Sequence, residues 1–434
     1  MSENYDAIII GAGVIGACTA YEMAKAGWKT LSLDKGPEAG YGSTSASCAI
    51  IRTYYSAFET CALAYEGWYY WKDWANYIGV PDESGLITYY DTGCLVMKTE
   101  ENGFLAKGCA IMDHIGCPYE HVAAEDVPNY MPGADLRQYV PAKRFEDEGF
   151  GEPTGPRVAG AVFFPCGGYV NDPKLSAHNA QRAAEAHGAT FRFNTAVTGI
   201  LRDGGRVGGV ELSDGTTVKA PVVVNVAGPH SSIINQMAGV TSGMKMSTRA
   251  LRHEVAHVPA PEGFEEGYRI VYSDSDIKTY MRTEQGRNLL VGSEDPECDG
   301  REWVDDPDNY DLNFSQQWKT MVMRAGQRLP KLGIPDTAKG VVALYDVSED
   351  WMPIYDRSDL PGYYMACGTS GNQFKTAPVV GKPMTALIEA CEAGRDHDTE
   401  PLTFHLDHVN QDISLGFFSR NREINMDSSF SVIG

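Results

Sequence analysis

The 434-residue sequence contains the run Ala7-Ile8-Ile9-Ile10-Gly11-Ala12-Gly13-Val14-Ile15-Gly16. Its first four residues are apolar and mostly β-branched, which predicts a strand buried on both faces. Residues 17–27 carry apolar side chains at helical spacing and end at a glycine, which predicts a helix. Residues 28–34 are a second predicted strand that ends in Asp34. Together these elements are the fingerprint of a dinucleotide-binding unit.

The residues of the glycine run have separate physical tasks. Gly11 makes the tight turn, Gly13 lets the backbone approach a pyrophosphate, and Gly16 lets the helix pack on the strand. The N-terminus of the helix, at Val14 and Ile15, faces the phosphates. We therefore predict that this segment binds a dinucleotide. A glycine-rich turn that binds no ligand is the alternative.

The segment after the second strand indicates which dinucleotide. Asp34 is expected to accept hydrogen bonds from a ribose diol, and Lys35 is assigned to the same site. A loop of small residues follows, Gly42-Ser43-Thr44-Ser45-Ala46-Ser47, and leads to Arg52. An NAD-dependent dehydrogenase would continue here with another strand and helix. A glycine- and serine-rich loop that leads to an arginine is typical of FAD enzymes.

Composition and charge narrow the class of protein. The formal net charge of −22 argues against nucleic acid and anionic membranes as partners, since both favour a basic surface. The ten cysteines include no C-x-x-C spacing, so we expect neither a metal site nor a disulfide framework. No apolar run reaches the length of a membrane span, and the first strand begins too early for a signal peptide. We expect a cytoplasmic protein of two domains.

The run Ile50-Ile51-Arg52-Thr53-Tyr54, with Gly42-Ser43 before it, carries a family resemblance. It resembles the D-amino-acid-oxidase superfamily of flavoproteins (the DAO family), and most of all its sarcosine-oxidase and glycine-oxidase branch. The resemblance implies an α/β fold. A Rossmann-like FAD-binding domain of the glutathione-reductase type (residues 1–85, 163–243 and 345–434) would be interleaved with an antiparallel-sheet substrate domain (residues 86–162 and 244–344).

Two basic residues are implied as the substrate-binding pair. In the family, the arginine matching Arg52 helps to bind the substrate carboxylate, and a guanidinium suits a carboxylate because it donates two parallel hydrogen bonds. The run Ser370-Gly371-Asn372-Gln373-Phe374-Lys375 resembles the family motif S-G-H-G-F-K, in which the lysine binds the same carboxylate. Arg52 and Lys375 are therefore the predicted catalytic residues, with a structural ion pair or a solvated lysine as the alternatives.

The same resemblance implies the remaining cofactor contacts. The predicted FAD-binding residues are Gly11, Gly13, Val14, Ile15, Gly16, Asp34, Lys35, Gly42, Ser43, Thr44, Val197, Ala227, Gly228, Gly371, Asn372, Gln373, Phe374 and Lys375. Two positions depart from the single-chain sarcosine oxidases. Ala343 stands where those enzymes bond the flavin through a cysteine, so we expect noncovalent FAD. Leu290 aligns with their oxygen-activating lysine, which puts fast reaction with oxygen in doubt.

The expected activity is FAD-dependent oxidation of the C–N bond of a small amine that carries a carboxylate. An N-methyl amino acid, an imino acid or a related amino acid would transfer a hydride to flavin N5, and oxygen or an electron carrier would then accept the electrons. One alternative is a dehydrogenase of the same fold that passes electrons to a carrier. Another is a flavoprotein subunit that depends on a partner chain. The specific substrate and the oligomeric state stay open.

Overall fold

The computed structural model describes residues 4–99, 103–264 and 270–434. Its first layer is a six-stranded sheet in the order β20-β21-β13-β1-β2-β9. The strands are β1 (Ala7–Ile10), β2 (Thr30–Leu33), β9 (Thr190–Arg192), β13 (Val222–Asn225), β20 (Ile354–Arg357) and β21 (Tyr363–Cys367). All neighbours pair in parallel except β20, which runs antiparallel to β21. The predicted first strand, helix and second strand are confirmed.

Both faces of this sheet are covered, which explains the apolar run in β1. Ala7 and Ile9 pack in one buried cluster with helices α1 (Val14–Lys25), α6 (Pro173–Ala186) and α9 (Ala377–Glu392). Ile8 and Ile10 belong to another cluster, beneath helix α7 (Ser231–Ala238) and a small sheet. That sheet contains β10 (Val197–Asp203), β11 (Arg206–Leu212) and β12 (Thr217–Lys219).

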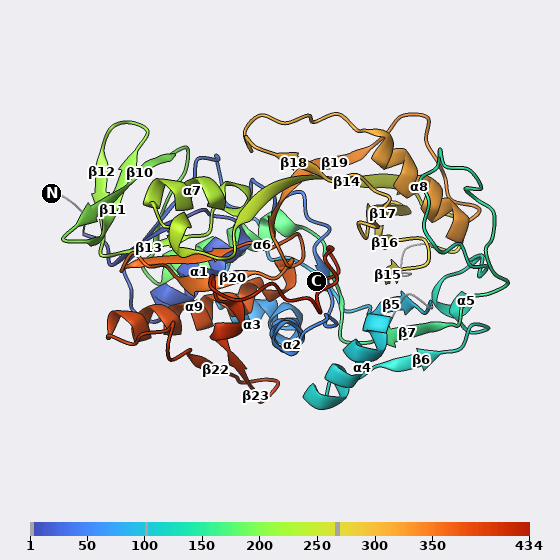
Figure 1. The fold of residues 1–434 in the computed structure, drawn as a ribbon, viewed down its shortest axis with the longest axis horizontal. Coiled ribbons are helices and arrows are strands. Elements are labelled where there is room, and N and C mark those ends of the chain that lie inside the picture. The colour runs from blue at the N-terminus through green and yellow to red at the C-terminus, as the bar shows by residue number, and fades with distance from the viewer. Residues whose placement is uncertain (1–3, 100–102, 265–269) are drawn as a thin grey trace.

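The second layer is a nine-stranded sheet in the order β18-β14-β17-β16-β15-β5-β7-β6, with β19 also paired to β14. Its strands are β5 (Cys94–Met97), β6 (Glu120–Val122), β7 (Ala161–Phe164), β14 (Thr248–Pro259), β15 (Val271–Asp274), β16 (Thr279–Glu284), β17 (Asn288–Ser293), β18 (Glu302–Val304) and β19 (Gly340–Ser348). The pairs are antiparallel except β15 with β5. Figure 1 shows long strand β14 reaching from one half of the molecule into the other.

The two faces of the second sheet have different neighbours. Met281, Leu289 and Val291 pack against helix α8 (Gln316–Arg328). Tyr280 and Leu290 face the other way, into a cluster that includes residues of the six-stranded half. The strand register, which the sequence leaves open, therefore directs Leu290 toward the first layer.

Shorter elements complete the fold. They are helices α2 (Phe58–Lys72), α3 (Trp74–Ile78), α4 (Gly103–Ile115) and α5 (Val127–Tyr130), and strands β3 (Ile50–Ile51), β4 (Tyr89–Tyr90), β8 (Gly168–Val170), β22 (Thr403–Leu406) and β23 (Gln411–Ser414). Strand β8 pairs with both β3 and β4. The described chain ends between the two halves of the molecule (Figure 1). Among the described residues, none of the helices has the length and apolarity needed to cross a membrane.

Candidate active site

The glycine turn between β1 and α1 forms a narrow cradle of backbone. Gly11 has a φ of +112°, and a Cβ there would collide with the carbonyl oxygen of Val226. A Cβ on Gly16 would collide with the oxygen of Gly11, so both positions require glycine. Gly13 stands at the N-cap of α1 and provides no side-chain cap. The turn thus places closely approachable backbone at a helix N-terminus, the arrangement that binds phosphate groups.

The loop that follows β2 lies directly on this turn. The hydroxyl of Thr44 accepts a hydrogen bond from the amide of Val14 at 3.1 Å, at the first turn of α1. The hydroxyl of Ser43 donates to the carbonyl of Leu344 in β19 at 2.7 Å. A Cβ on Gly42 would meet no other described atom within 4 Å. This loop therefore connects the helix N-terminus of one layer with a strand of the other.

Asp34 is held in place by the backbone of the same turn. Its two carboxylate oxygens accept from the amides of Ala12 and Gly36, each at 2.7 Å. Lys35, in contrast, lies in a surface cluster, where its Nζ is 2.7 Å from Nε2 of His230 and forms an ion pair with Asp308. Asp34 is thus at the turn, as a ribose-binding acid requires, while Lys35 is already engaged by protein groups.

Three further predicted residues lie around the ends of β1 and β13. The amide of Val226, next to Ala227, donates to Ile10 at 2.9 Å and continues the ladder between the two strands. Gly228 has a φ of +57°, and a Cβ there would have open space among the described residues. Val197 is buried at the start of β10. The structure thereby gathers these residues at the edge of the sheet that carries the glycine turn.

The second glycine turn, residues 370–373, lies at the end of β21. A Cβ on Gly371 would lie 2.5 Å from the ring of Tyr345 in β19, which requires glycine there. The side chains of Asn372 and Gln373 are buried and joined by a hydrogen bond of 2.6 Å. Asn372 also donates to the carbonyl of Trp351 at 3.3 Å. These two side chains therefore brace the turn from inside the protein.

Phe374 has a packing role in this structure. Its ring stacks on Trp71 of α2, with the ring centres 5.1 Å apart and the planes 9° apart. Trp71 in turn donates to the carbonyl of Lys375 at 2.8 Å. The aromatic ring therefore attaches the turn to α2, and the adjacent lysine is held in a defined orientation.

Lys375 is only 4% exposed. Its Nζ donates to the carbonyl of Asn372 at 2.9 Å and lies 5.5 Å from the centre of the Tyr55 ring. Burial, and next the nearby charge of Arg52, lower the pKa of this lysine well below its usual value. A buried ammonium in such surroundings favours an anionic partner.

Arg52 is brought to the same place. Its guanidinium carbon lies 4.1 Å from the centre of the Tyr55 ring, the ring that also borders Lys375. The residue after β3 and the turn of residues 370–375 thus bring two buried basic side chains to one tyrosine ring. The guanidinium is already engaged by protein: it donates to the carbonyl of Tyr54 and, through Nη2, to Val432 at 3.0 Å and Ile433 at 2.5 Å.

The contribution of residues 428–433 was not anticipated from the sequence. Val432 and Ile433 pack in the cluster of Tyr280, Leu290 and Tyr345. The only local signal was the apolar pair Val432-Ile433 after a run of polar residues. Neither spacing nor composition connects that pair with an arginine 380 positions earlier.

A cavity of about 630 Å³ lies beside this segment. The nine-stranded half provides Lys278 and Glu294 to its wall, and the other side is formed by Ser429, Ser431 and Ile433. Burial raises the pKa of Glu294 to about 7, although the charge of Lys278 acts to lower it.

Arg282 is a buried basic residue on β16 of the same sheet. It donates to the carbonyl of Cys48 at 2.6 Å and pairs with Glu284 at 2.8 Å. These bonds engage its guanidinium with protein groups, so it ties β16 to the loop before β3.

One cluster among the described residues has the spacing of metal ligands, formed by Asp82, Glu83 and His178. His178 is 2.8 Å from Asp82, and Glu83 pairs with Arg182. The same Asp82 accepts from Asn179 at 2.7 Å. These protein partners account for the cluster as a polar contact between α6 and the loop before β4.

Comparison with known proteins identifies the family and several relatives. A family model described as FAD dependent oxidoreductase (DAO) matches residues 6–387. Sarcosine oxidase subunit beta of Rhodobacter capsulatus is 24% identical over 391 residues, which cover 89% of this chain and 85% of that protein. Glycine oxidase of Geobacillus kaustophilus is 24% identical over 418 residues, covering 94% and 99%. L-proline dehydrogenase from P. horikoshii has a similar fold, with a TM-score of 0.73 at 21% identity, covering 91% of this chain and 95% of that structure.

Proposed function

We propose that this chain, which belongs to the DAO family of FAD-dependent oxidoreductases, oxidises the C–N bond of a small amine that bears a carboxylate. The family match confirms the resemblance drawn from the motifs and FAD as the cofactor. The single observation that carries the substrate class is the meeting of Arg52 and Lys375, two buried cations from distant segments, around the ring of Tyr55.

The first half of the proposed site binds the cofactor. FAD supplies a two-electron, hydride-accepting ring when it is bound. The N-terminus of α1 and the backbone at Gly11 and Gly13 would hold its pyrophosphate, and Asp34 its ribose. The glycine cradle supports this assignment, because a Cβ at Gly11 would collide with Val226. The six-stranded half, which contains the parallel βαβ unit of residues 7–33, is accordingly proposed as the glutathione-reductase-type FAD domain (residues 1–85, 163–243 and 345–434).

The second half orients the substrate. Arg52 and Lys375 would bind its carboxylate, and a carboxylate beside Lys375 favours the charged ammonium that burial otherwise disfavours. With the carboxylate held by two groups, the Cα–H bond has one orientation relative to the cofactor ring. Hydride leaves from the neutral amine, so this proposal assigns the chain no strong base. Sarcosine, glycine or an imino acid would satisfy these contacts.

A dehydrogenase that passes electrons to a carrier is the second candidate. Leu290 on β17 faces the proposed site, at the position where the resemblance expects an oxygen-activating lysine. Partner dependence is part of the same proposal, because one relative is named as a beta subunit of sarcosine oxidase. We also propose that FAD is bound without a covalent bond, since β19 carries Ala343 in place of the expected cysteine.

The test is an anaerobic titration of the purified FAD-bound protein. N-methyl amino acids, imino acids and D-amino acids are added one at a time while the absorbance of oxidised flavin is followed. Bleaching by a carboxylate-bearing amine, and none by its amide analogue, supports the proposal. Rapid recovery on admission of air identifies an oxidase, and slow recovery a dehydrogenase. If FAD is bound and none of these compounds bleaches it, the result contradicts amine oxidation by the single chain.

A further inference from the structure

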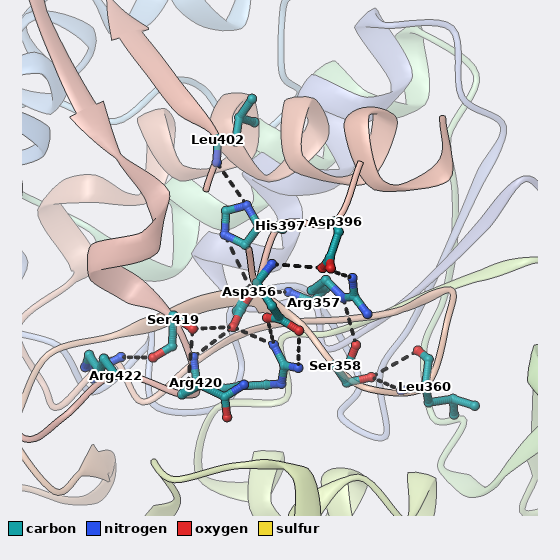
Figure 2. Close-up of polar contacts among 12 residues, drawn as sticks. Asp356, Arg357, Ser358, Leu360, Asp396, His397, Leu402, Ser419, Arg420 and Arg422 are labelled. Carbon is teal, nitrogen blue, oxygen red and sulfur yellow. Dashed lines mark hydrogen bonds and ion pairs between the residues drawn. The ribbon is translucent and has the colours of Figure 1, made fainter. Parts of the chain in front are cut away.

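Residues 419–433 run from the six-stranded half of the molecule into the proposed site. The first part, residues 419–422, is an anchor (Figure 2). Arg420 pairs with Asp356 of β20 at 3.0 Å, and the hydroxyl of Ser419 donates to the same carboxylate at 3.0 Å. Arg422 pairs with Asp350 at 2.8 Å. Because Asp356 and Asp350 are fully buried, the anchor is firmly attached.

We call the last part, residues 428–433, the plug. Its side chains Val432 and Ile433 are buried among aromatic groups, including Tyr280 and Tyr345. The carbonyls of Val432 and Ile433 accept hydrogen bonds from Nη2 of Arg52. The plug therefore lies where the proposed function needs a substrate carboxylate.

The hydrogen bonds of the plug to Arg52 are of a kind that a carboxylate can replace. A carbonyl oxygen is a neutral acceptor, whereas a carboxylate forms shorter, charge-assisted and bidentate bonds to a guanidinium. The chain between anchor and plug has contacts of its own: the amide of Asn425 donates to Asp350 at 3.3 Å, and Asp427 pairs with Lys107 at 3.1 Å, while Ile424 and Met426 are exposed. Release of the plug therefore leaves the anchor in place.

Release of the plug would also enlarge the site. Ile433 lines the 630 Å³ cavity and its own carbonyl binds Arg52, so this one residue contacts both the cavity and the guanidinium. Lys278 and Glu294 form the opposite wall. Without the plug, Arg52 and this cavity would be one continuous space.

We propose that residues 428–433 are an intramolecular ligand of Arg52 that the substrate carboxylate displaces; this rests on the proposed function of Arg52. The plug competes with the substrate, so the apparent dissociation constant of a carboxylate equals its intrinsic value divided by the fraction of open chains. The affinity for substrate is thus set in part by the stability of the plugged state.

The first measurement is hydrogen–deuterium exchange in the FAD-bound protein, with acetate as the probe and acetamide as the neutral control. Acetate is expected to accelerate exchange in residues 428–433 and to leave residues 419–422 unchanged. Acetamide is expected to change neither. Acetate that perturbs the flavin spectrum without altering exchange in 428–433 overturns the proposal.

The second measurement compares acetate binding to the full chain and to a chain that lacks residues 428–434. The shortened chain is expected to bind acetate at least about tenfold more tightly. The peptide Ser-Ser-Phe-Ser-Val-Ile-Gly, added separately, should compete with acetate, and a scrambled peptide should not. Equal affinity of the two chains for acetate overturns the proposal that the plug competes with the substrate, while it leaves the proposed function intact.

If the shortened chain does not fold, a double variant of the full chain takes its place in the binding test. V432S/I433S keeps both carbonyls but loses their apolar packing, so it should shift acetate affinity in the same direction. Acetate that binds none of these proteins contradicts the carboxylate-binding role of Arg52, and both proposals then fail. The two failures are thereby distinguished.

Discussion

The guanidinium of Arg52 and the backbone carbonyl of Ile433, 381 positions apart in the sequence, are joined by a hydrogen bond of 2.5 Å. This bond ties the loop behind the first glycine turn to the end of the described chain. It also occupies the group that the proposed activity assigns to the substrate. If both proposals hold, substrate binding and plug release are the same event at Arg52.

Replacement of Lys375 tests the proposed carboxylate pair. Lys375→Met is expected to raise KM about 10- to 100-fold, because one charge-assisted hydrogen bond is lost. The melting temperature should not fall, since a buried cation is replaced by an apolar side chain of similar length. Steady-state kinetics and thermal unfolding measure the two effects.

The control for this change is Lys382→Met. Lys382 lies on α9 and donates to the hydroxyl of Tyr70 at 2.5 Å. Its replacement is expected to leave KM unchanged. A Lys375→Met enzyme with normal KM and normal flavin content would place the carboxylate elsewhere.

Replacement of Gly11 tests the cofactor cradle. Gly11→Ala should yield protein without flavin, because the new Cβ would collide with the oxygen of Val226. Gly27→Ala is the matched control: its φ is +91°, but no described atom lies within 4 Å of the added carbon. It should cost about 1 kcal/mol of stability for the left-handed backbone and retain FAD. Flavin absorbance per mole of protein measures how much FAD each variant retains. Full flavin content in Gly11→Ala would contradict the assignment of the cradle to FAD.

The titration of Glu294 makes stability depend on pH. Its pKa is raised from an ordinary 4.5 to about 7, so between these values the folded chain binds more protons than the unfolded chain. The free energy of unfolding therefore falls as pH rises through this window and stays lowered above it. Glu294→Gln removes this dependence, and its Oε1 still accepts from Ser273, whose hydroxyl is 2.6 Å from Glu294.

Urea unfolding at pH 5 and pH 8 measures the effect. The Gln variant should gain roughly 1–3 kcal/mol relative to wild type at pH 8 and little at pH 5. Glu297→Gln, at an exposed position on the same cavity wall, is the control and should leave the free energy of unfolding unchanged at both pH values. A gain of equal size at both pH values would argue against titration of Glu294.

The anchor is expected to contribute to stability. Asp356→Asn leaves the buried guanidinium of Arg420 with only its second acidic partner, Asp398. The expected loss is about 1–3 kcal/mol in the free energy of unfolding. Asp396→Asn, which affects an exposed pair with Arg357, should change it by less than about 1 kcal/mol. Equal losses in the two variants would show that the anchor contributes no more than a surface ion pair.

The first forty residues were predictable because their structure is local. The strand, the turn at Gly11 and the helix follow from backbone freedom and periodicity within one short segment. The register of β16 and β17 was not predictable. A one-residue slip moves every side chain of a strand to the other face, and only the observed pairing of Arg282 with Leu290 settles which face each occupies.

The candidate site also has features that the sequence predicts and features that only the structure shows. The sequence by itself determined the family, the cofactor and the types of residue at the two glycine turns, because these depend on short motifs whose spacing reflects local geometry. Only the tertiary structure decided that Arg52 and Lys375 both border the ring of Tyr55, and that Val432 and Ile433 hold the arginine. Such contacts join segments hundreds of residues apart. They arise from burial of apolar surface, which has no directional signature in the sequence.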